Sequence, residues 1–328
     1  MKVLITGGSG FIGHHIVDYL LQKTDWEIVL LERLAHSGNL NRLTELPSIQ
    51  RIEIGDRLKL FWHDLRSPVN DFLIKNIGEV NYIIHLAAST HVDRSIENPM
   101  DFVMDNVVGT ANLLDFARKQ KGLKLFMNFS TDEVFGPAPD GVYHKETDSH
   151  KPSNPYSATK SGACQLAYSY FITYGLPIVN TFTMNNFGER QHPEKFIPKM
   201  IKKIEAGEPM PIYQGKDSTE KASRVWMYAG NTASAVHFLL ENGKPGEGYN
   251  VIGPDELDLL TLGNKVAEIL GKPLIPEFVG FYTQRPGHDR RYALDGSKMK
   301  EMGWIPPYSF EESLRKTVEF TRDNSKWM

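Results

Sequence analysis

Two short segments of the chain carry side chains that could transfer protons, and YSATK is the first of them. Tyr156 and Lys160 are four residues apart, so on a helix they lie on one face. A phenol is a weak base at neutral pH, but a neighbouring ammonium group favours the phenolate and lowers its pKa. The pair could therefore take a proton from a hydroxyl group while a hydride leaves the same carbon. Found alone, this spacing would more often be an exposed helix face with an incidental lysine.

The second segment is STDEVFG, residues 130–136, which follows an apolar run that we expect to be a buried strand. Adjacent acidic residues behind a strand often belong to a loop or a helix cap. An alcohol oxidation by a Tyr–Lys pair needs one hydroxyl-bearing neighbour, and this segment adds the two carboxyl groups of Asp132 and Glu133. Once C4 of a hexose is oxidised, a carboxylate could remove the acidic C5 proton while a carboxylic acid protonates the departing C6 hydroxyl. The pair therefore predicts loss of water after an oxidation.

TGGSGFIG, residues 6–13, lies where a first strand should turn into a helix, and it predicts a dinucleotide-binding turn. Gly7 permits the tight turn, Gly10 lets a pyrophosphate approach the backbone, and Gly13 allows close contact of helix and sheet. Glu32, at the end of the second expected strand, can accept hydrogen bonds from an adenosine ribose and would repel a 2′-phosphate. The motif therefore favours NAD over NADP, a preference that Arg33 weakens without reversing it. Without Glu32, such a turn could be merely structural.

Short apolar runs alternate with segments of helical length through the first half of the chain. The expected strands are 2–6, 27–31, 58–63, 82–86, 124–130 and 178–183, and the expected helices are 11–22, 99–119 and 155–174. Asn154 should cap the last helix, with Pro155 at its first position. The alternation predicts an α/β fold with a Rossmann-type doubly wound parallel sheet. Beyond about residue 185, prolines break the pattern into shorter elements, which predicts a smaller mixed α/β substrate-binding lobe and a cleft between the two.

Composition limits the partners and the compartment. With 328 residues and a net charge of -3, the chain gives no electrostatic argument for a nucleic-acid or membrane partner. Cys164 is the single cysteine, so no intrachain disulfide can form and a reducing compartment is expected. No apolar run approaches the roughly 20 residues that span a bilayer, and no secretory signal precedes the glycine turn. We expect a cytoplasmic protein, and no metal site is predicted.

Together these segments resemble the NAD-dependent nucleotide-sugar 4,6-dehydratases of the extended short-chain dehydrogenase/reductase family, over nearly the whole chain. The matching segments are TGGSGFIG (6–13), GNL (38–40), HLAASTHVDRSI (85–96), NVVGT (106–110), STDEVFG (130–136), YSATK (156–160), NNFG with PEKFIP (185–198) and RPGHDRRYA (285–293). The resemblance implies a lyase that oxidises C4 of an NDP-hexose with enzyme-bound NAD, eliminates water across C5 and C6, and returns the hydride to C6. The product would be an NDP-4-keto-6-deoxyhexose.

The resemblance also implies roles for individual residues. Asp132 would be the acid for the C6 hydroxyl and Glu133 the base at C5, with Thr131 beside Tyr156 at the C4 oxygen. The expected cofactor-binding residues are Gly7, Gly10, Phe11, Ile12, Gly13, Glu32, Asp64, Leu65, Ala87, Ala88, Tyr156 and Lys160. The expected substrate-binding residues are Asn186, Glu194, Lys195, Tyr213, Arg224, Asn250, Arg285 and His288, while Arg290 and Arg291 suit either a diphosphate or the surface.

The resemblance further implies two domains and a homodimer. Residues 1–182 and about 223–248 should bind NAD, and residues 183–222 and 249–328 should bind the nucleotide sugar. The dimer would form through the helices expected at 99–119 and 155–174.

The substrate lobe departs from the family pattern. Glu189-Arg190 stands where Pro-Tyr is usual, and Val225 stands in place of an aspartate. The base and the sugar therefore stay open: dTDP-glucose is the expected substrate, and UDP-N-acetylglucosamine is an alternative. A nucleotide-sugar 4-epimerase would use the same tyrosine and lysine, but epimerisation needs neither a C5 base nor a C6 acid. A non-catalytic nucleotide-sugar-binding protein is disfavoured because every expected chemical group is present.

Overall fold

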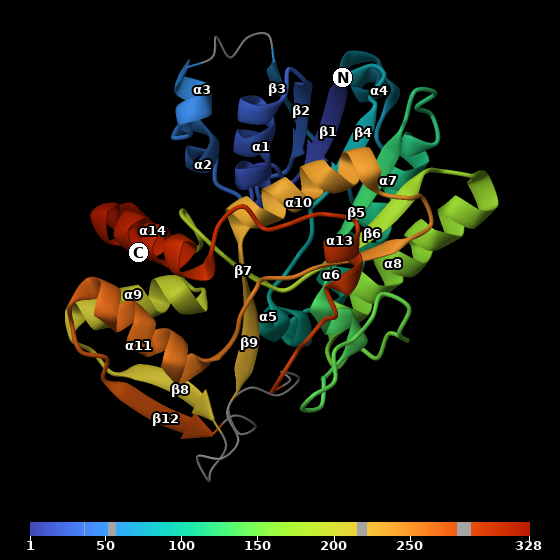
Figure 1. The fold of residues 1–328 in the computed structure, drawn as a ribbon. Coiled ribbons are helices and arrows are strands. Elements are labelled where there is room, and N and C mark those ends of the chain that lie inside the picture. The colour runs from blue at the N-terminus through green and yellow to red at the C-terminus, as the bar shows by residue number, and fades with distance from the viewer. Residues whose placement is uncertain (36, 52–56, 215–221, 281–289) are drawn as a thin grey trace.

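The computed structural model describes residues 1–35, 37–51, 57–214, 222–280 and 290–328, and a seven-stranded sheet in the order β10-β6-β5-β4-β1-β2-β3 forms its centre (Figure 1). The strands are β1 (Lys2–Thr6), β2 (Glu27–Glu32), β3 (Leu58–Trp62), β4 (Tyr82–His85), β5 (Leu125–Thr131), β6 (Ile178–Thr183) and β10 (Gly248–Val251). All neighbouring pairs run parallel. The Rossmann-type prediction is confirmed, and the strand order reverses between β1 and β4, where such sheets bind ligands.

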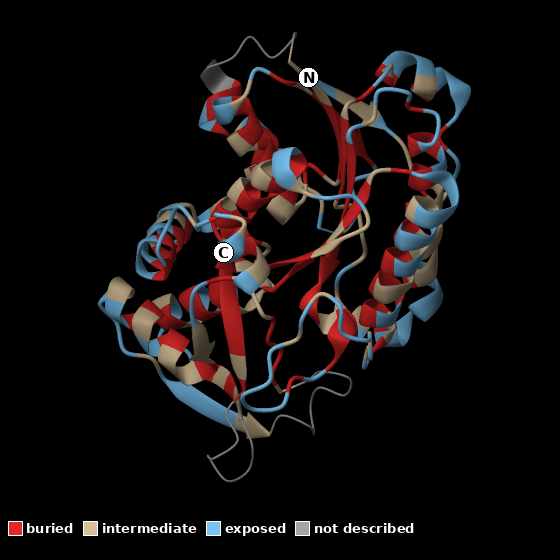
Figure 2. Ribbon diagram, turned by 45° about the vertical axis from the view of Figure 1, so that its right-hand side comes forward, coloured by how far each residue is buried: buried red, intermediate tan, exposed pale blue. Residues whose placement is uncertain are grey.

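Helices cover both faces of this sheet because successive side chains of a strand point to opposite sides. Val3 and Ile5 of β1 join the buried cluster beneath α1 (Phe11–Lys23) and α10 (Ala229–Asn242). Leu4 joins the opposite cluster, beneath α4 (Asp71–Ile77), α7 (Gly109–Ala117) and α8 (Pro155–Tyr174). Figure 2 shows the buried residues concentrated along these strands and on the inward faces of the helices.

The helix expected at 99–119 differs in detail from the one observed. It is divided into α6 (Pro99–Phe102), the π-helical segment η1 (Val103–Val108) and α7. π-helical turns are rare and occur often at functional sites. Here the turn carries Asn106, whose amide accepts a hydrogen bond from the Ser89 backbone and donates to the Thr159 hydroxyl on α8. The π-turn therefore ties the loop after β4 to the helix that carries Tyr156.

Helix α8 begins where the sequence predicts. The Asn154 side chain accepts a hydrogen bond from the backbone N–H of Ser157, and the Ser157 hydroxyl accepts one from the backbone N–H of Asn154, which makes a capping box. Pro155 occupies the first turn, and Gly175 ends the helix in the left-handed conformation. These two ends fix the rotation of α8, and with it the direction of the Tyr156 and Lys160 side chains.

The smaller lobe is mixed α/β, as predicted. Its sheets are β11-β9-β7, made of β7 (Asn185–Phe187), β9 (Ser223–Tyr228) and β11 (Glu256–Asp258), and β12-β8, made of β8 (Met210–Gln214) and β12 (Pro276–Gly280). Helices α9 (Phe196–Ala206), α11 (Leu259–Leu270) and α14 (Phe310–Asp323) bury their apolar faces in one cluster with residues of β7, β8 and β9. Strand β9 thus lies in the small lobe, whereas β10 is a strand of the large sheet and α10 packs on that sheet. We therefore propose domain boundaries near residues 229 and 251, instead of 223 and 248.

Short elements complete the described chain. They are α2 (Asn41–Thr44), α3 (Pro47–Arg51), α5 (Val92–Glu97), η2 (Asp132–Phe135), α13 (Ser297–Glu301) and η3 (Ser325–Trp327). None of the helices in the described ranges is long and apolar enough to cross a membrane.

Candidate active site

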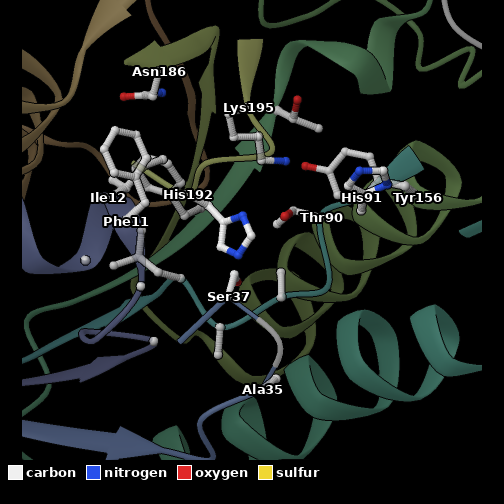
Figure 3. A pocket seen from close by; sticks show the side chains of 18 of the residues that line it. Phe11, Ile12, Ala35, Ser37, Thr90, His91, Tyr156, Asn186, His192 and Lys195 are labelled. Atoms are coloured by element: carbon white, nitrogen blue, oxygen red, sulfur yellow. The ribbon is translucent and has the colours of Figure 1, made fainter. Parts of the chain in front are cut away.

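A cavity of about 680 Å³ opens at the carboxyl ends of β1, β2, β4 and β5 and reaches into the smaller lobe. Its walls include the predicted residues Gly7, Gly10, Phe11, Ile12, Gly13, Glu32, Asp64, Leu65, Ala87, Ala88, Thr131, Asp132, Glu133, Tyr156, Lys160, Asn186, Glu194, Lys195, Tyr213 and Arg224. Figure 3 shows Phe11 and Ile12 on one side of this space, Tyr156 and His91 on the other, and the ring of His192 between them. The fold therefore brings together residues that the sequence keeps far apart.

The glycine turn is shaped to receive a diphosphate. Gly7 has φ +74°, and a Cβ there would lie 2.9 Å from the backbone nitrogen of Ala87, so Gly7 makes the close approach to the sheet. Gly13 packs against the turn itself, because its Cβ would overlap the Gly7 carbonyl oxygen. Gly10 is the N-cap of α1 and makes no side-chain cap, so the first N–H groups of the helix face the cavity without a capping side chain. This cradle fits the diphosphate of a dinucleotide such as NAD.

The end of the cavity beside Glu32 contains several charged side chains. Glu32 is 4% exposed and its carboxylate accepts hydrogen bonds from the backbone and hydroxyl of Ser9, at 3.0 and 2.6 Å. Burial raises the pKa of Glu32, while the Ser9 hydrogen bonds lower it. Arg33, the residue that weakened the preference for NAD, is ion-paired with Asp64 at 3.2 Å and with Asp105 at 2.9 Å. Because two carboxylates neutralise its guanidinium, Arg33 does not offset the repulsion of a 2′-phosphate by Glu32.

Tyr156 and Lys160 project from one face of α8, and both are buried. Burial, followed by the charge of Glu133, raises the pKa of Tyr156, while its hydrogen bond with Thr131 lowers it. This direction is the opposite of the one expected from the sequence. The main reason is burial, which disfavours the charged phenolate, and the Lys160 ammonium group, which was expected to favour it, donates to the Phe129 carbonyl at 2.6 Å. Burial also lowers the pKa of Lys160 to about 8.

Asp132 and Glu133 occupy unlike environments in η2, directly after β5. Asp132 is 2% exposed, and burial and then the Glu133 charge raise its pKa to about 7. Its Oδ1 accepts hydrogen bonds from the Thr131 hydroxyl and the Glu133 backbone N–H, whereas its Oδ2 has no hydrogen-bond partner among the described residues. Glu133 accepts from the Asn154 amide at 3.3 Å and from the Tyr292 hydroxyl at 3.4 Å. One carboxyl group is therefore suited to hold a proton at neutral pH, and its neighbour is arranged as an acceptor.

The burial of Asp132 predicts a pH-dependent change in stability for Asp132→Asn. The folded-state pKa of about 7 lies above the ordinary value of 3.8, so this group's stabilising contribution is complete below 3.8 and is lost as pH rises through 7. At about pH 8 the amide should raise the free energy of unfolding by about 1–3 kcal/mol, because the wild type then buries a charge. At about pH 5 the gain should be much smaller.

Urea unfolding of both proteins at the two pH values, at equal cofactor saturation, measures this difference. Asp140→Asn is the matched control, because the Asp140 side chain is 80% exposed. An equal gain for Asp132→Asn at both pH values would contradict the assignment of a proton to Asp132.

The predicted substrate residues around the smaller lobe are partly engaged with one another. Glu194 lies 3.5 Å from Arg94 and 3.9 Å from Lys195. The Arg224 guanidinium donates to the Ser223 carbonyl at 2.7 Å. The Asn186 amide donates to the Thr183 hydroxyl and to the Met184 carbonyl, both at 2.9 Å, so its two N–H groups are used inside the turn between β6 and β7.

Some predicted binding residues lie elsewhere. Asn250 is fully buried in β10 and donates to the His144 and Asp295 carbonyls, so it joins two loops and does not line the cavity. The structure therefore corrects its interpretation as a substrate-binding residue. Arg291 is bound to Glu256 at 2.7 Å and also does not line the cavity. Arg290 pairs with Asp140, and the predictions for Arg285 and His288 lie outside the described residues.

The cavity also contains residues that the sequence did not single out, among them Arg42, His91, His192 and Trp226. His91 and His192 lie inside or beside segments that carry the resemblance, so proximity to those segments was the available signal. Arg42 follows the GNL segment by two positions, in a short helix whose orientation the sequence does not indicate.

Comparisons with known proteins agree with this geometry. The sequence profile of a family described as GDP-mannose 4,6 dehydratase matches residues 4–317. A dTDP-glucose 4,6-dehydratase from Salmonella typhimurium is 37% identical, covering 100% of this chain and 94% of that protein. The low-salt glycan biosynthesis protein Agl12 from Haloferax volcanii is 40% identical, covering 98% of both.

Solved structures show the same fold. A dTDP-glucose 4,6-dehydratase from Streptomyces venezuelae, crystallised with NAD, matches with a TM-score of 0.88 at 34% identity, over 100% of this chain and 98% of that one. A UDP-glucose 4-epimerase from Thermus thermophilus, in complex with NAD, matches with a TM-score of 0.87 at 28% identity, over 99% and 100%. The chain therefore belongs to the GDP-mannose 4,6 dehydratase family, as an NAD-dependent nucleotide-sugar 4,6-dehydratase of the extended short-chain dehydrogenase/reductase type.

Proposed function

We propose that the enzyme acts on dTDP-glucose and converts it to dTDP-4-keto-6-deoxyglucose with loss of water. The observation that carries the proposal is the pair of unlike carboxyl groups beside Tyr156. Asp132 is buried with a pKa raised to about 7, and Glu133 next to it accepts two hydrogen bonds from uncharged donors. An elimination needs one group that gives a proton and one that takes a proton, and neighbouring environments of this kind supply them.

The residues divide the chemistry in three steps. NAD, held by the glycine turn and the residues around it, would supply the acceptor for the C4 hydride and the source of that hydride at C6. Tyr156 takes the proton of the C4 hydroxyl, and Thr131, which hydrogen-bonds the Tyr156 phenol, holds the C4 oxygen. Glu133 then takes the C5 proton, while Asp132 gives its proton to the C6 hydroxyl, which leaves as water. When the hydride returns to C6, Glu133 gives its proton back to C5, and the proton that Tyr156 took from the C4 hydroxyl replaces the one that Asp132 gave. The sugar therefore loses one water in all.

Binding of the cofactor and of the sugar nucleotide is divided between the two lobes. We assign the glycine turn, Glu32 and the predicted residues around them to NAD, with Lys160 at the nicotinamide ribose. Glu194, Lys195, Tyr213 and Arg224 line the far part of the cavity and are assigned to the nucleotide diphosphate. Asn186 is assigned there through its position, although its amide donors are bonded within the protein.

A substrate panel tests the proposal. The purified enzyme is incubated separately with dTDP-glucose, UDP-glucose, UDP-N-acetylglucosamine and their CDP and GDP relatives. The masses of the products are then measured by mass spectrometry. We expect dTDP-glucose to lose the mass of one water. If UDP-N-acetylglucosamine lost water and dTDP-glucose did not react, the proposed substrate would be wrong, while the proposed reaction, loss of water, would stand.

A 4-epimerase is the second candidate, favoured by the fold it shares with the Thermus thermophilus enzyme. Epimerisation leaves the mass of the sugar unchanged, so the same panel separates the two reactions. The buried Asp132 argues for dehydration, because an epimerase gains nothing from a protonated carboxyl group beside the reacting sugar.

We also propose a homodimer in the cytoplasm. Exposed apolar side chains gather on α6 and α8, where Met100 is 66%, Tyr168 48% and Ile172 63% exposed. Helix faces of this kind are buried when two copies pair. The buried free thiol of Cys164 suits a reducing compartment. Light scattering of the purified protein measures its molecular mass and so tests for a dimer. Fractionation of the producing cells shows whether the protein is in the cytoplasm.

A further inference from the structure

Arg42 is a buried cation at the edge of the glycine turn. It lies in α2 and is 1% exposed. Its guanidinium donates to three main-chain carbonyls, those of Ser37, of Ser9 at 3.3 Å and of Arg190 at 2.9 Å. Ser9 belongs to the glycine turn, Ser37 to the segment after β2, and Arg190 to the smaller lobe. One side chain thus joins three parts of the molecule that meet at the cofactor end of the cavity.

No carboxylate of the described chain lies within 4.0 Å of this guanidinium, so its charge is not paired by an acidic side chain there. Burial lowers the pKa of Arg42 to about 10, which leaves the group charged at neutral pH. Carbonyl dipoles offset only part of the cost of removing a cation from water. Arg33, in contrast, is paired with Asp64 and Asp105. The described residues give this cation three carbonyl oxygens and the ring of Trp327, 5.5 Å away, but no anionic countercharge.

The surroundings of Arg42 indicate where that countercharge lies. Arg42, Ser9, Ser37 and Gly38 line the same cavity as Gly10, the uncapped N-terminus of α1. The positive end of a helix already attracts an anion. The hydrogen bond to Ser9 brings a full positive charge to the same turn. A diphosphate held on the turn would therefore meet the helix end and the guanidinium together.

We propose that Arg42 is a cofactor-binding residue, whose buried guanidinium is the countercharge of the NAD diphosphate. The inference rests on the NAD chemistry given above and adds a residue to it. It also gives a role to the Glu189-Arg190 departure. Arg190 has φ +62°, a conformation that L-residues rarely adopt, and in it the Arg190 carbonyl reaches Arg42.

The side chain of Arg190 anchors this contact to the C-terminal end of the chain. Its guanidinium pairs with Glu45 at 3.6 Å and lies 4.7 Å from the ring of Phe320 on α14. Figure 1 shows α14 beside α9. The backbone of the smaller lobe therefore holds Arg42 in place from the side opposite the turn.

Arg57 offers a matched control. Its guanidinium also donates to three main-chain carbonyls, those of Trp26, Leu21 and Thr24, at 3.3, 3.3 and 2.6 Å. Arg57 does not line the cavity. Replacing either arginine removes the same kind of structural contact, but only Arg42 should affect an anion bound at the turn.

The experiment compares a ligand with a diphosphate and one without. Cofactor-depleted wild type, Arg42→Met, Arg42→Gln and Arg57→Met are titrated calorimetrically with ADP, adenosine and NAD. Both Arg42 variants should bind ADP and NAD about 10- to 100-fold more weakly, while the affinity for adenosine changes by less than about threefold. Arg57→Met should keep the wild-type ratio of ADP to adenosine affinity, even if its melting temperature falls.

The ratio of ADP to adenosine affinity decides the outcome. An unchanged ratio in Arg42→Gln, or an equal loss of ADP and adenosine binding, overturns the inference, and Arg42→Gln serves even if Arg42→Met does not fold. The proposed function fails in a different way, if the wild type binds none of the three ligands or removes no water from any sugar nucleotide. If the enzyme removes water from a sugar nucleotide but its preference for ADP over adenosine does not depend on Arg42, the inference about Arg42 is wrong and the proposed function stands.

Discussion

Glu133→Gln is expected to oxidise the sugar at C4 and to stop before water is lost, so that reduced nicotinamide accumulates on the enzyme. The amide cannot take the C5 proton, but it keeps the size of the side chain and an oxygen for the hydrogen bonds from Asn154 and Tyr292. Loss of a general base costs about 10²- to 10⁴-fold in rate, and steady turnover should fall in that range. Absorbance of the reduced cofactor in a single-turnover experiment measures the accumulation.

The matched control is Glu146→Gln. Glu146 accepts a hydrogen bond from the backbone of Asn250 at 3.0 Å and does not line the cavity, so this variant should turn over normally and show no lasting reduced cofactor. Full turnover by Glu133→Gln would remove the role of C5 base from Glu133. A variant that never reduced its cofactor would instead place Glu133 at the first step.

Much of the fold could be predicted because the periodicity of apolar residues and the capping residues at helix ends indicate the same helices and strands. The six expected strands of the large sheet are all observed, and the Asn154-Pro155 signal marks the start of α8. Signals of this kind depend only on neighbouring residues. The seventh strand, β10, was not expected, because its residues are separated from their partner β6 by the whole of β7, α9, β8, β9 and α10. Long-range pairing of this kind leaves no local pattern.

The site was predictable to the extent that its residues follow strands. Thr131 and Asp132 come at the carboxyl end of β5, where parallel sheets place ligands, and both line the cavity. Asn250 was expected in the pocket from the resemblance alone, but its side chain donates to the His144 and Asp295 carbonyls.

Charge and burial were the least predictable properties of the site. The sequence shows that Lys160 follows Tyr156 by one turn, but it does not show that the ammonium group donates to the Phe129 carbonyl. Nor does it show that Arg42, from a four-residue helix, is buried against the glycine turn. Both facts depend on side-chain direction within the packed fold.

Tyr156→Phe is expected to block the reaction one step before Glu133→Gln does, so that no reduced cofactor forms. The ring of Tyr156 packs near Phe102, with centroids 6.4 Å apart, and phenylalanine keeps that contact while it removes the hydroxyl that receives the C4 proton. Turnover should fall about 10²- to 10⁴-fold. In the wild type, burial and Glu133 raise the pKa of Tyr156, so the first reduction should quicken as pH rises and more phenolate forms. Any residual reduction in Tyr156→Phe should lack this dependence.

The double variant Tyr156→Phe/Glu133→Gln tests the order of the two steps. If Tyr156 acts first, the double variant behaves like Tyr156→Phe and stays oxidised, although Glu133→Gln alone accumulates reduced cofactor. Because Asp132 gives its proton in the elimination, turnover should slow as pH rises through the Asp132 pKa of about 7. Reduced cofactor in the double variant would mean that another group takes the C4 proton, and Thr131, bonded to both Asp132 and the Tyr156 phenol, would be the residue to replace next.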